Sequence, residues 1–305
     1  MSNTSERETF VQARRNSIGG SDIGAVLGVS KFKTATDVYL SKTTEQPEQQ
    51  GEHLYWGNAL EDPIADRFEA ETGWKVQRDP AIRFHPAYPW ASANADGLIL
   101  DENGEPQGIL EIKTSSAFKT ADWGAEDTDE IPLEYIAQVQ WYMEIFNVDF
   151  ACIAVLIGGN RYRQFRVEKD LELIRTMLEK ARHFWEENIL KGIPPEPAES
   201  GDLLKTHPHD DGETVEADTE ALCAYNELKT LKAQAAELAE QIKEREEIVK
   251  LKIGAHKGLS LNGSVICTWA SQSARRFDSS AFKAAHPDTY AAFTKESNSR
   301  VLRLK

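Results

Sequence analysis

The stretch Ala-Asp-Gly-Leu-Ile-Leu, residues 95–100, and the stretch Gly-Ile-Leu-Glu-Ile-Lys-Thr, residues 108–114, decide the fold of this chain. An Asn-Gly pair at 103–104 separates them and is typical of a tight turn, so the two stretches are predicted to be neighbouring strands. Side chains alternate between the two faces of a strand, which places Glu111 and Lys113 on the same face.

The predicted hairpin brings two carboxylates, Asp96 and Glu111, onto one sheet surface with the ammonium group of Lys113. Carboxylate oxygens are the ligands that a hard cation such as Mg²⁺ prefers. A lysine beside that cation could orient or deprotonate an attacking water, or steady a phosphate. The pattern indicates metal-dependent phosphodiester hydrolysis. An Asp-Gly turn followed by a solvated strand face is the alternative that the hairpin alone leaves open.

Length and composition favour a soluble protein of one large domain or two. The chain has 305 residues, of which 40% are hydrophobic. Its three cysteines, Cys152, Cys223 and Cys267, lack metal-ligand spacing and indicate thiols in a reducing cytoplasm. No apolar run approaches a membrane span and the polar N-terminus has no signal-peptide core, so no membrane role is expected. The expected location is the cytoplasm.

The formal net charge of −15 argues at first against a nucleic-acid partner. The charge is uneven, however, because residues 201–250 hold 13 acidic and 6 basic side chains. Nearly half of the excess therefore comes from one sixth of the chain. A locally basic DNA channel is compatible with the remainder, so net charge does not exclude DNA.

The segment from Arg14 to Asp22, Arg-Arg-Asn-Ser-Ile-Gly-Gly-Ser-Asp, is a candidate phosphate site. Its two glycines suit a tight turn, and Ser21 is predicted to cap a helix over 22–27. A helix start fronted by glycines, a hydroxyl and arginines can hold a phosphate. A simple capped helix after a loop is the alternative reading of the same residues.

The order of predicted elements indicates a mixed α/β fold with a central sheet. Glu61 lies beside the apolar stripe of one predicted helix, and Gln138 lies among apolar neighbours in another, where it needs a hydrogen-bond partner if buried. The sequence predicts a helix over 57–71, a strand over 74–84, the hairpin described above, a helix over 131–146, strands over 150–157 and 162–168, and a helix over 171–190.

The chain is predicted to divide into a domain over 1–198, a linker over 199–213 and a C-terminal region over 214–305. A long helix is expected over 214–253, followed by strands over 259–261 and 264–270, a helix over 279–285 and a strand over 300–304. Part of the long helix fits a heptad seam, interrupted by Arg245, that could pack within the chain or between subunits. The seam consists of Leu228, Leu231, Ala235, Leu238, Ile242 and Val249.

With these residues in view, the chain resembles the YqaJ and lambda exonuclease-like phage-type nucleases of the PD-(D/E)xK superfamily. The resemblance covers about residues 10–195 and rests on five blocks in family order. The blocks are Arg14 to Ser21, Trp56 to Glu61, Asn94 to Gly97, Glu111 to Lys113, and Ala137 to Gln140. It implies a restriction-endonuclease-like core with a central mixed sheet flanked by helices, plus a C-terminal extension of helix and strand. Ala95 departs from the proline that many superfamily members have before the aspartate.

The resemblance implies a metal site made by four residues. Asp96 and Glu111 would bind the metal, helped by the backbone carbonyl of Ile112. Glu61 would touch the metal or its water shell. The expected ion is Mg²⁺, with Mn²⁺ as a substitute.

The resemblance also implies roles for residues around the metal. Lys113 would position or activate water, and burial among apolar neighbours would lower its pKa. Gln138 would steady the site or the scissile phosphate. Arg14 and Ser21 would hold the terminal 5′-phosphate, with Arg15 as an alternative to Arg14.

The implied activity is 5′-to-3′ digestion of one strand of linear double-stranded DNA, which leaves 3′ single-stranded tails. By the same analogy, the partners are a single-strand annealing protein of phage recombination and further copies of the chain, with a trimeric ring as one assembly. An endonuclease of the same superfamily and a non-catalytic DNA-binding or scaffolding module are the alternatives.

Overall fold

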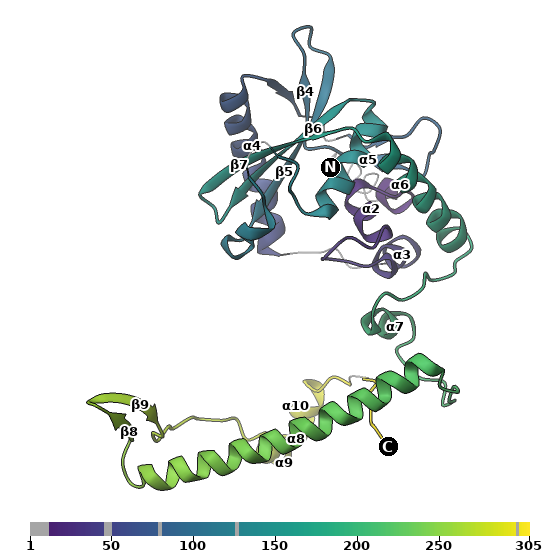
Figure 1. Ribbon diagram of the computed structural model, residues 1–305. Coiled ribbons are helices and arrows are strands. Elements are labelled where there is room, and N and C mark those ends of the chain that lie inside the picture. Colours follow the sequence, from purple (N-terminus) through teal and green to yellow (C-terminus); the bar gives the residue numbers. More distant parts are fainter. Residues whose placement is uncertain (1–11, 46–50, 79–80, 126–127, 297–298) are drawn as a thin grey trace. The chain divides into compact units, whose positions relative to one another are not determined.

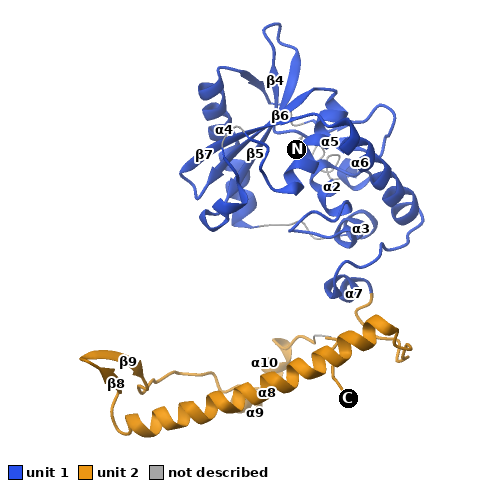
Figure 2. Ribbon diagram, in the orientation of Figure 1, with its two compact units in different colours: residues 1–206 blue, residues 207–305 orange. Residues whose placement is uncertain are grey.

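The chain divides into two units, Met1–Thr206 and His207–Lys305 (Figure 2). The structure is a computed structural model that describes residues 12–45, 51–78, 81–125, 128–296 and 299–305. The division falls inside the predicted linker over 199–213, whose first part forms helix α7 (Ser200–Thr206). In α7, Asp202 accepts a hydrogen bond of 2.7 Å from the Thr34 hydroxyl, so this helix belongs to the first unit.

A five-stranded sheet organises the first unit, with strand order β1-β4-β5-β6-β7 (Figure 1). Only β5 and β6 pair in parallel and the other pairs are antiparallel, so the sheet is mixed, as predicted. The bounds are β1 Lys75–Gln77, β4 Gly97–Leu100, β5 Pro106–Ser115, β6 Phe150–Ile157 and β7 Arg161–Glu168. A separate antiparallel pair joins β2 (Arg83–Phe84) to β3 (Ser92–Ala93). The single strand predicted over 74–84 is therefore wrong, because this stretch contributes β1 to the main sheet and β2 to the separate pair.

Helices cover both faces of this sheet because alternate residues of β5 point to opposite sides. Leu110 and Ile112 pack in one apolar cluster with Phe68 of α4 (Glu52–Thr72). Ile109 belongs to a second cluster with side chains of α5 (Leu133–Phe146). The predicted mixed α/β architecture, a central sheet flanked by helices, is thereby confirmed.

The remaining helices of the first unit include one correction to the predicted ends. Helix α2 spans Gly20–Val26 and starts after Gly19, so Ser21 lies in its first turn and is not its cap. The Asp22 carboxylate takes the capping role by accepting the Gly19 N–H at 3.1 Å. The others are α3 (Ala35–Thr43), a 3₁₀ helix (Ala117–Asp122), and α6 (Leu171–His183), which continues as a π-helical stretch (Phe184–Ile189).

Asp22 joins α2 to α3 through a buried ion-pair network. Its two oxygens lie 2.6 Å from Lys33 Nζ and 2.7 Å from Lys42 Nζ. Burial alone raises the pKa of the Asp22 carboxyl, but the two ammonium groups outweigh burial and hold the pKa well below its usual range. The network therefore fixes the backbone that carries the Arg14–Asp22 segment.

The second unit is built on the long helix α8 (Thr219–Ile253), capped by Asp218 and therefore shorter than the 214–253 predicted. It continues through a hairpin of β8 (Gly258–Leu261) and β9 (Ser264–Thr268) and helix α9 (Ser279–Ala285). The strand predicted over 300–304 is wrong, because β8 and β9 pair only with each other and give it no partner.

Helix α10 (Pro287–Ala292) was not predicted, although Pro287 in its first turn is a recognised start signal. Among the described residues, no helix is both long enough and apolar enough to cross a lipid bilayer.

We expect Asp22→Asn to lower the free energy of unfolding by about 3–5 kcal/mol at pH 7, because the buried ammonium of Lys42 and the partly exposed one of Lys33 lose their counter-charge. The folded-state pKa of Asp22 lies below its usual value of 3.8. The stabilisation from the ionised Asp22 carboxylate is therefore complete above about pH 3.8, and it is lost as the pH falls from there through the folded-state pKa. Urea unfolding at pH 7 and pH 3 measures both effects. The exposed Glu179→Gln serves as the control, and equal stability of the two variants at pH 7 would contradict the assignment.

Candidate active site

A cavity of about 170 Å³ opens where the N-terminal segment meets the sheet and α5. Five separate segments of sequence contribute its walls, and five of the residues selected from sequence line it together. These are Arg14, Ser21, Asp96, Glu111 and Gln138. Of the two adjacent arginines, Arg14 lines this cavity and Arg15 does not.

Glu111 is the most deeply buried carboxylate of the cavity. Its Oε1 accepts hydrogen bonds from the Lys113 ammonium and, at 2.6 Å, from Gln138 Nε2. Its Oε2 is buried without a hydrogen-bond partner among the described residues. Burial and the neighbouring Asp96 carboxylate raise the pKa of Glu111 to about 8, although Lys113 opposes the shift. One oxygen atom is therefore available to a ligand in the cavity.

Asp96 is held against Glu111 by the backbone of the next strand. The Ile112 N–H donates to Asp96 Oδ2 at 2.7 Å, which ties the residue just before β4 to the middle of β5. Burial raises the pKa of Asp96, although Lys113, the Ile112 N–H and Arg78 act in the opposite direction. The predicted juxtaposition of Asp96, Glu111 and Lys113 is thus present.

The expected low pKa of Lys113 is wrong. Burial lowers the pKa of this ammonium, but Glu111 and Asp96 outweigh burial, so the pKa is raised above its ordinary value. The face of the Tyr135 ring lies 5.2 Å from Lys113 Nζ and stacks in turn on Trp123. Lys113 is therefore held as a cation between two carboxylates and an aromatic ring.

Glu61 stands at the edge of the carboxylate cluster. Burial and the Asp96 charge raise its pKa, which indicates that the two groups repel each other through a poorly solvated region. Arg78 bridges the two residues, because its guanidinium donates to the backbone carbonyls of Glu61 and Asp96 at 3.4 Å each. This arginine joins α4 to the start of β4.

The N-terminal segment is fixed against the core by backbone and hydroxyl contacts. The Ile18 N–H donates to the Trp90 carbonyl at 2.7 Å, and the Ser17 and Ser92 hydroxyls are 2.7 Å apart. Arg14 Nη2 donates to Ser21 Oγ at 3.1 Å, so the two residues selected for a phosphate already lie side by side.

Gly20 is where this segment contacts α5 most closely. A Cβ atom at this position would lie 2.2 Å from the Tyr142 ring. The Tyr142 hydroxyl accepts a hydrogen bond of 3.0 Å from Gln138 Nε2, the nitrogen that also binds Glu111. A continuous set of contacts therefore links the Arg14–Ser21 pair to Glu111.

The donor atoms of the cavity fit a hard divalent cation completed by water or substrate oxygens. Within the described ranges, no three His, Cys, Asp or Glu side chains are arranged to enclose a metal by themselves. Two buried oxygens, Glu111 Oε2 and Asn94 Oδ1, nevertheless have no hydrogen-bond partner among the described residues. Both residues line the cavity together with Asp96. Carboxylate and amide oxygens with retained waters are the usual Mg²⁺ environment.

Comparison with known proteins places the chain in a family. A model described as the YqaJ-like viral recombinase domain matches residues 9–149. The uncharacterized protein YqaJ of Bacillus subtilis (strain 168) is 34% identical over 309 residues, which cover 98% of this chain and 94% of that protein. The chain belongs to the YqaJ family. The resemblance drawn from the five sequence blocks is confirmed.

Solved structures of exonucleases show a more distant likeness to this YqaJ family member. LHK-Exo, an alkaline exonuclease from Laribacter hongkongensis, is 22% identical in its complex with dAMP, with a TM-score of 0.49 over 61% of this chain and 94% of that chain. A phage related exonuclease from Haemophilus somnus 129PT is 15% identical, with a TM-score of 0.42 over 58% of this chain and 96% of that chain.

Three residues of this YqaJ family site carried no role in the sequence analysis. Asn94 contributes an unpartnered oxygen, Arg78 bridges two backbone segments, and Tyr142 supports Gln138. Asn94 adjoins Asp96 in one of the five blocks, and Tyr142 follows Gln138 by one helical turn, so both had a sequence signal. Arg78 had none, because its contacts depend on how α4 packs beside the sheet.

Gly20→Ala is expected to lower the free energy of unfolding by about 1–3 kcal/mol, because the Tyr142 ring must move to admit the new methyl group. Gly19→Ala is the matched control, since the nearest atom to its Cβ would be 3.7 Å away. Chemical unfolding followed by tryptophan fluorescence compares the two variants. If the Gly20 variant were as stable as the Gly19 variant, the close contact with Tyr142 would be refuted.

Proposed function

We propose that the chain is a Mg²⁺-dependent nuclease that digests one strand of linear double-stranded DNA from its 5′ end and leaves 3′ single-stranded tails. The observation that carries this proposal is the buried, unpartnered Oε2 of Glu111 beside Asp96 in a cavity. A protein interior holds such charge poorly unless a cation joins it. Membership of a viral recombinase family supports the same reading.

Asp96 and Glu111 would hold the metal directly, with the Asn94 amide oxygen, the Ile112 carbonyl and Glu61 as further direct or water-mediated partners. When bound, Mg²⁺ or Mn²⁺ would polarise the phosphate and lower the pKa of a bound water. The raised pKa values of all three carboxyl groups support this assignment, because each group gains from a nearby positive charge.

Hydrolysis requires a water oxygen to bond to phosphorus while the bond from phosphorus to the leaving oxygen breaks. Lys113 retains its proton in the free protein, which favours an orienting role over a role as base. Its ammonium would fix the water and the phosphate oxygens by hydrogen bonds and charge. Gln138 would hold the Glu111 carboxylate at a constant angle through its 2.6 Å hydrogen bond.

The 5′-to-3′ direction is supported by the Arg14–Ser21 pair in the same cavity as Asp96 and Glu111. A guanidinium and a hydroxyl bind phosphate oxygens well. A duplex whose terminal 5′-phosphate sits on this pair would present a nearby phosphodiester to the carboxylates. An endonuclease, in contrast, needs no holder for a chain end.

Two partners belong to the proposal through the family resemblance alone. A single-strand annealing protein would take up the 3′ tails for phage-type recombination, and further copies of the chain, with a trimeric ring as one arrangement, would retain the enzyme on its DNA.

Glu111→Gln and Lys113→Ala are each expected to reduce Mg²⁺-dependent digestion of linear duplex by about a thousandfold or more, while the fold is retained. Millimolar Mg²⁺ should raise the midpoint of thermal unfolding of the unaltered protein but not of the Glu111 variant, because ligand binding stabilises only a folded site. Glu179→Gln is the control for both measurements. A folded Glu111 or Lys113 variant with undiminished cleavage would contradict the proposal, and an unaltered protein without digestion would indicate a non-catalytic module.

Arg14→Ala should abolish a preference of about 10- to 100-fold for a 5′-phosphate over a 5′-hydroxyl end, since a charged hydrogen bond to phosphate is lost. Arg15→Ala is the control and should keep the preference. Digestion of strand-specifically labelled duplexes measures both the preference and the direction. Cleavage of closed circular DNA at a comparable rate would identify an endonuclease instead.

A further inference from the structure

Helix α8 presents an apolar stripe that its own chain leaves largely uncovered. The helix has 35 residues, and Ile253 at its end is its one buried residue. Leu231, Leu238 and Ile242 are 60%, 57% and 52% exposed. A long helix is held mainly by the packing of an apolar face, so a helix with this much free apolar surface is incomplete without a partner.

The stripe follows a heptad repeat across the helix. In the register that places Leu228 and Ile242 at position a, the intervening leucines at 231 and 238 fall at position d. Leucine at d combined with β-branched residues at a, here Ile242 and Val249, favours two parallel strands over three or four. No a position between 221 and 249 carries a charge in this register.

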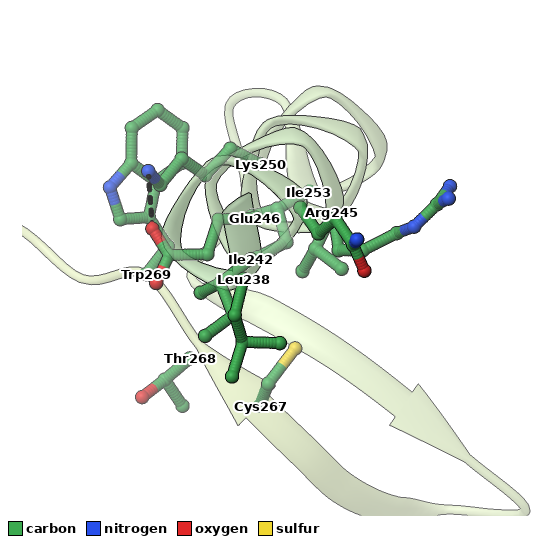
Figure 3. Close-up of a pocket in the computed structure, with 11 residues that line it drawn as sticks. Leu238, Ile242, Arg245, Glu246, Lys250, Ile253, Cys267, Thr268 and Trp269 are labelled. Carbon is green, nitrogen blue, oxygen red and sulfur yellow. Dashed lines mark hydrogen bonds and ion pairs between the residues drawn. The ribbon is translucent and has the colours of Figure 1, made fainter. Parts of the chain in front are cut away.

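A groove of about 630 Å³ coincides with this seam between α8 and the end of β9 (Figure 3). Leu238, Ile242, Arg245 and Val249 line it and occupy four consecutive a and d positions. Trp269 lies at the β9 end of the groove. The Arg245 guanidinium extends away from Leu238 and Ile242, so this basic residue leaves the apolar floor open (Figure 3).

Charges flanking the seam are complementary between two copies in register. Glu227 falls at position g and Lys232 at position e, the pair that meets across a parallel two-stranded coiled coil. Most other charged residues of the helix fall at the outward positions b, c and f. A second α8 therefore brings two favourable Glu-Lys pairs and places its own leucines opposite those of the first.

We propose that α8 docks on α8 of a second copy of this chain as a parallel, in-register, two-stranded coiled coil over residues 221–249. The occupant of the groove is the a and d side chains of the partner helix. This interface lies wholly in the second unit and does not depend on the nuclease proposal; because it joins two copies, it is an alternative to the trimeric ring.

Disulfide trapping tests the register. In full-length protein carrying Cys223→Ser and Cys267→Ser, we expect Leu231→Cys to form a covalent dimer in a glutathione redox buffer. Lys243→Cys, at an outward b position, is the matched control and should remain single-chain on a non-reducing gel. Absence of the cross-link at 231, or equal cross-linking at 231 and 243, would overturn the proposal, because an antiparallel or intrachain arrangement separates the two 231 positions.

Disruption of the seam gives a second measurement. Leu231→Asp with Leu238→Asp should weaken self-association by about a hundredfold or more in sedimentation, because carboxylates replace the d side chains. Lys229→Asp with Lys243→Asp introduces the same two aspartates at b positions and should leave association unchanged. In both variants, the midpoint of thermal unfolding of the first unit and the rate of digestion of linear DNA should be unchanged. Unaltered association of the seam variant would refute the interface, whatever the outcome of the nuclease assay.

Discussion

The burial of the Glu111 carboxylate is the constraint on which the site depends. It lies in the middle of the sheet, away from solvent, so its oxygens must find their hydrogen-bond partners within the protein. Gln138 of α5 and Lys113 of the same strand donate hydrogen bonds to its Oε1, while the Asp96 carboxylate, just before β4, repels it. None of these contacts survives a shift of β5 by one residue, because that shift would turn Glu111 to the other face.

The single parallel pair in the sheet explains how α5 reaches this position. Strands β5 and β6 run in the same direction, so the chain must cross over one face between them, and α5 is that crossover. It therefore covers the face to which Glu111 points, while α4 covers the face of Leu110 and Ile112. The crossover helix itself therefore places the Gln138 amide against the buried Glu111 carboxyl group.

Sequence reasoning succeeded where local periodicity specifies geometry. The hairpin and the shared face of Glu111 and Lys113 followed from strand alternation around an Asn-Gly turn, and the pairing of Arg14 with Ser21 followed from their shared segment. It failed where a property depends on which groups the fold brings into contact. The pKa of Lys113 is set by two carboxylates as well as by its burial, and Arg78 contacts two segments whose packing no local pattern encodes. The strand predicted at 300–304 failed because alternation alone supplies no neighbouring strand.

The contact between Gly20 and Tyr142 has a consequence for the geometry of the substrate. Tyr142 and Gln138 are four residues apart on α5, a rise of about 6 Å along the helix. The segment that carries Arg14 rests on the first of these side chains, and Glu111 is bound to the second. A rigid helix, and not a flexible loop, thus separates the Arg14–Ser21 pair from the Glu111 carboxylate. For the proposed exonuclease, α5 would therefore set the spacing between the residues that hold the 5′ end and the carboxylates that cut.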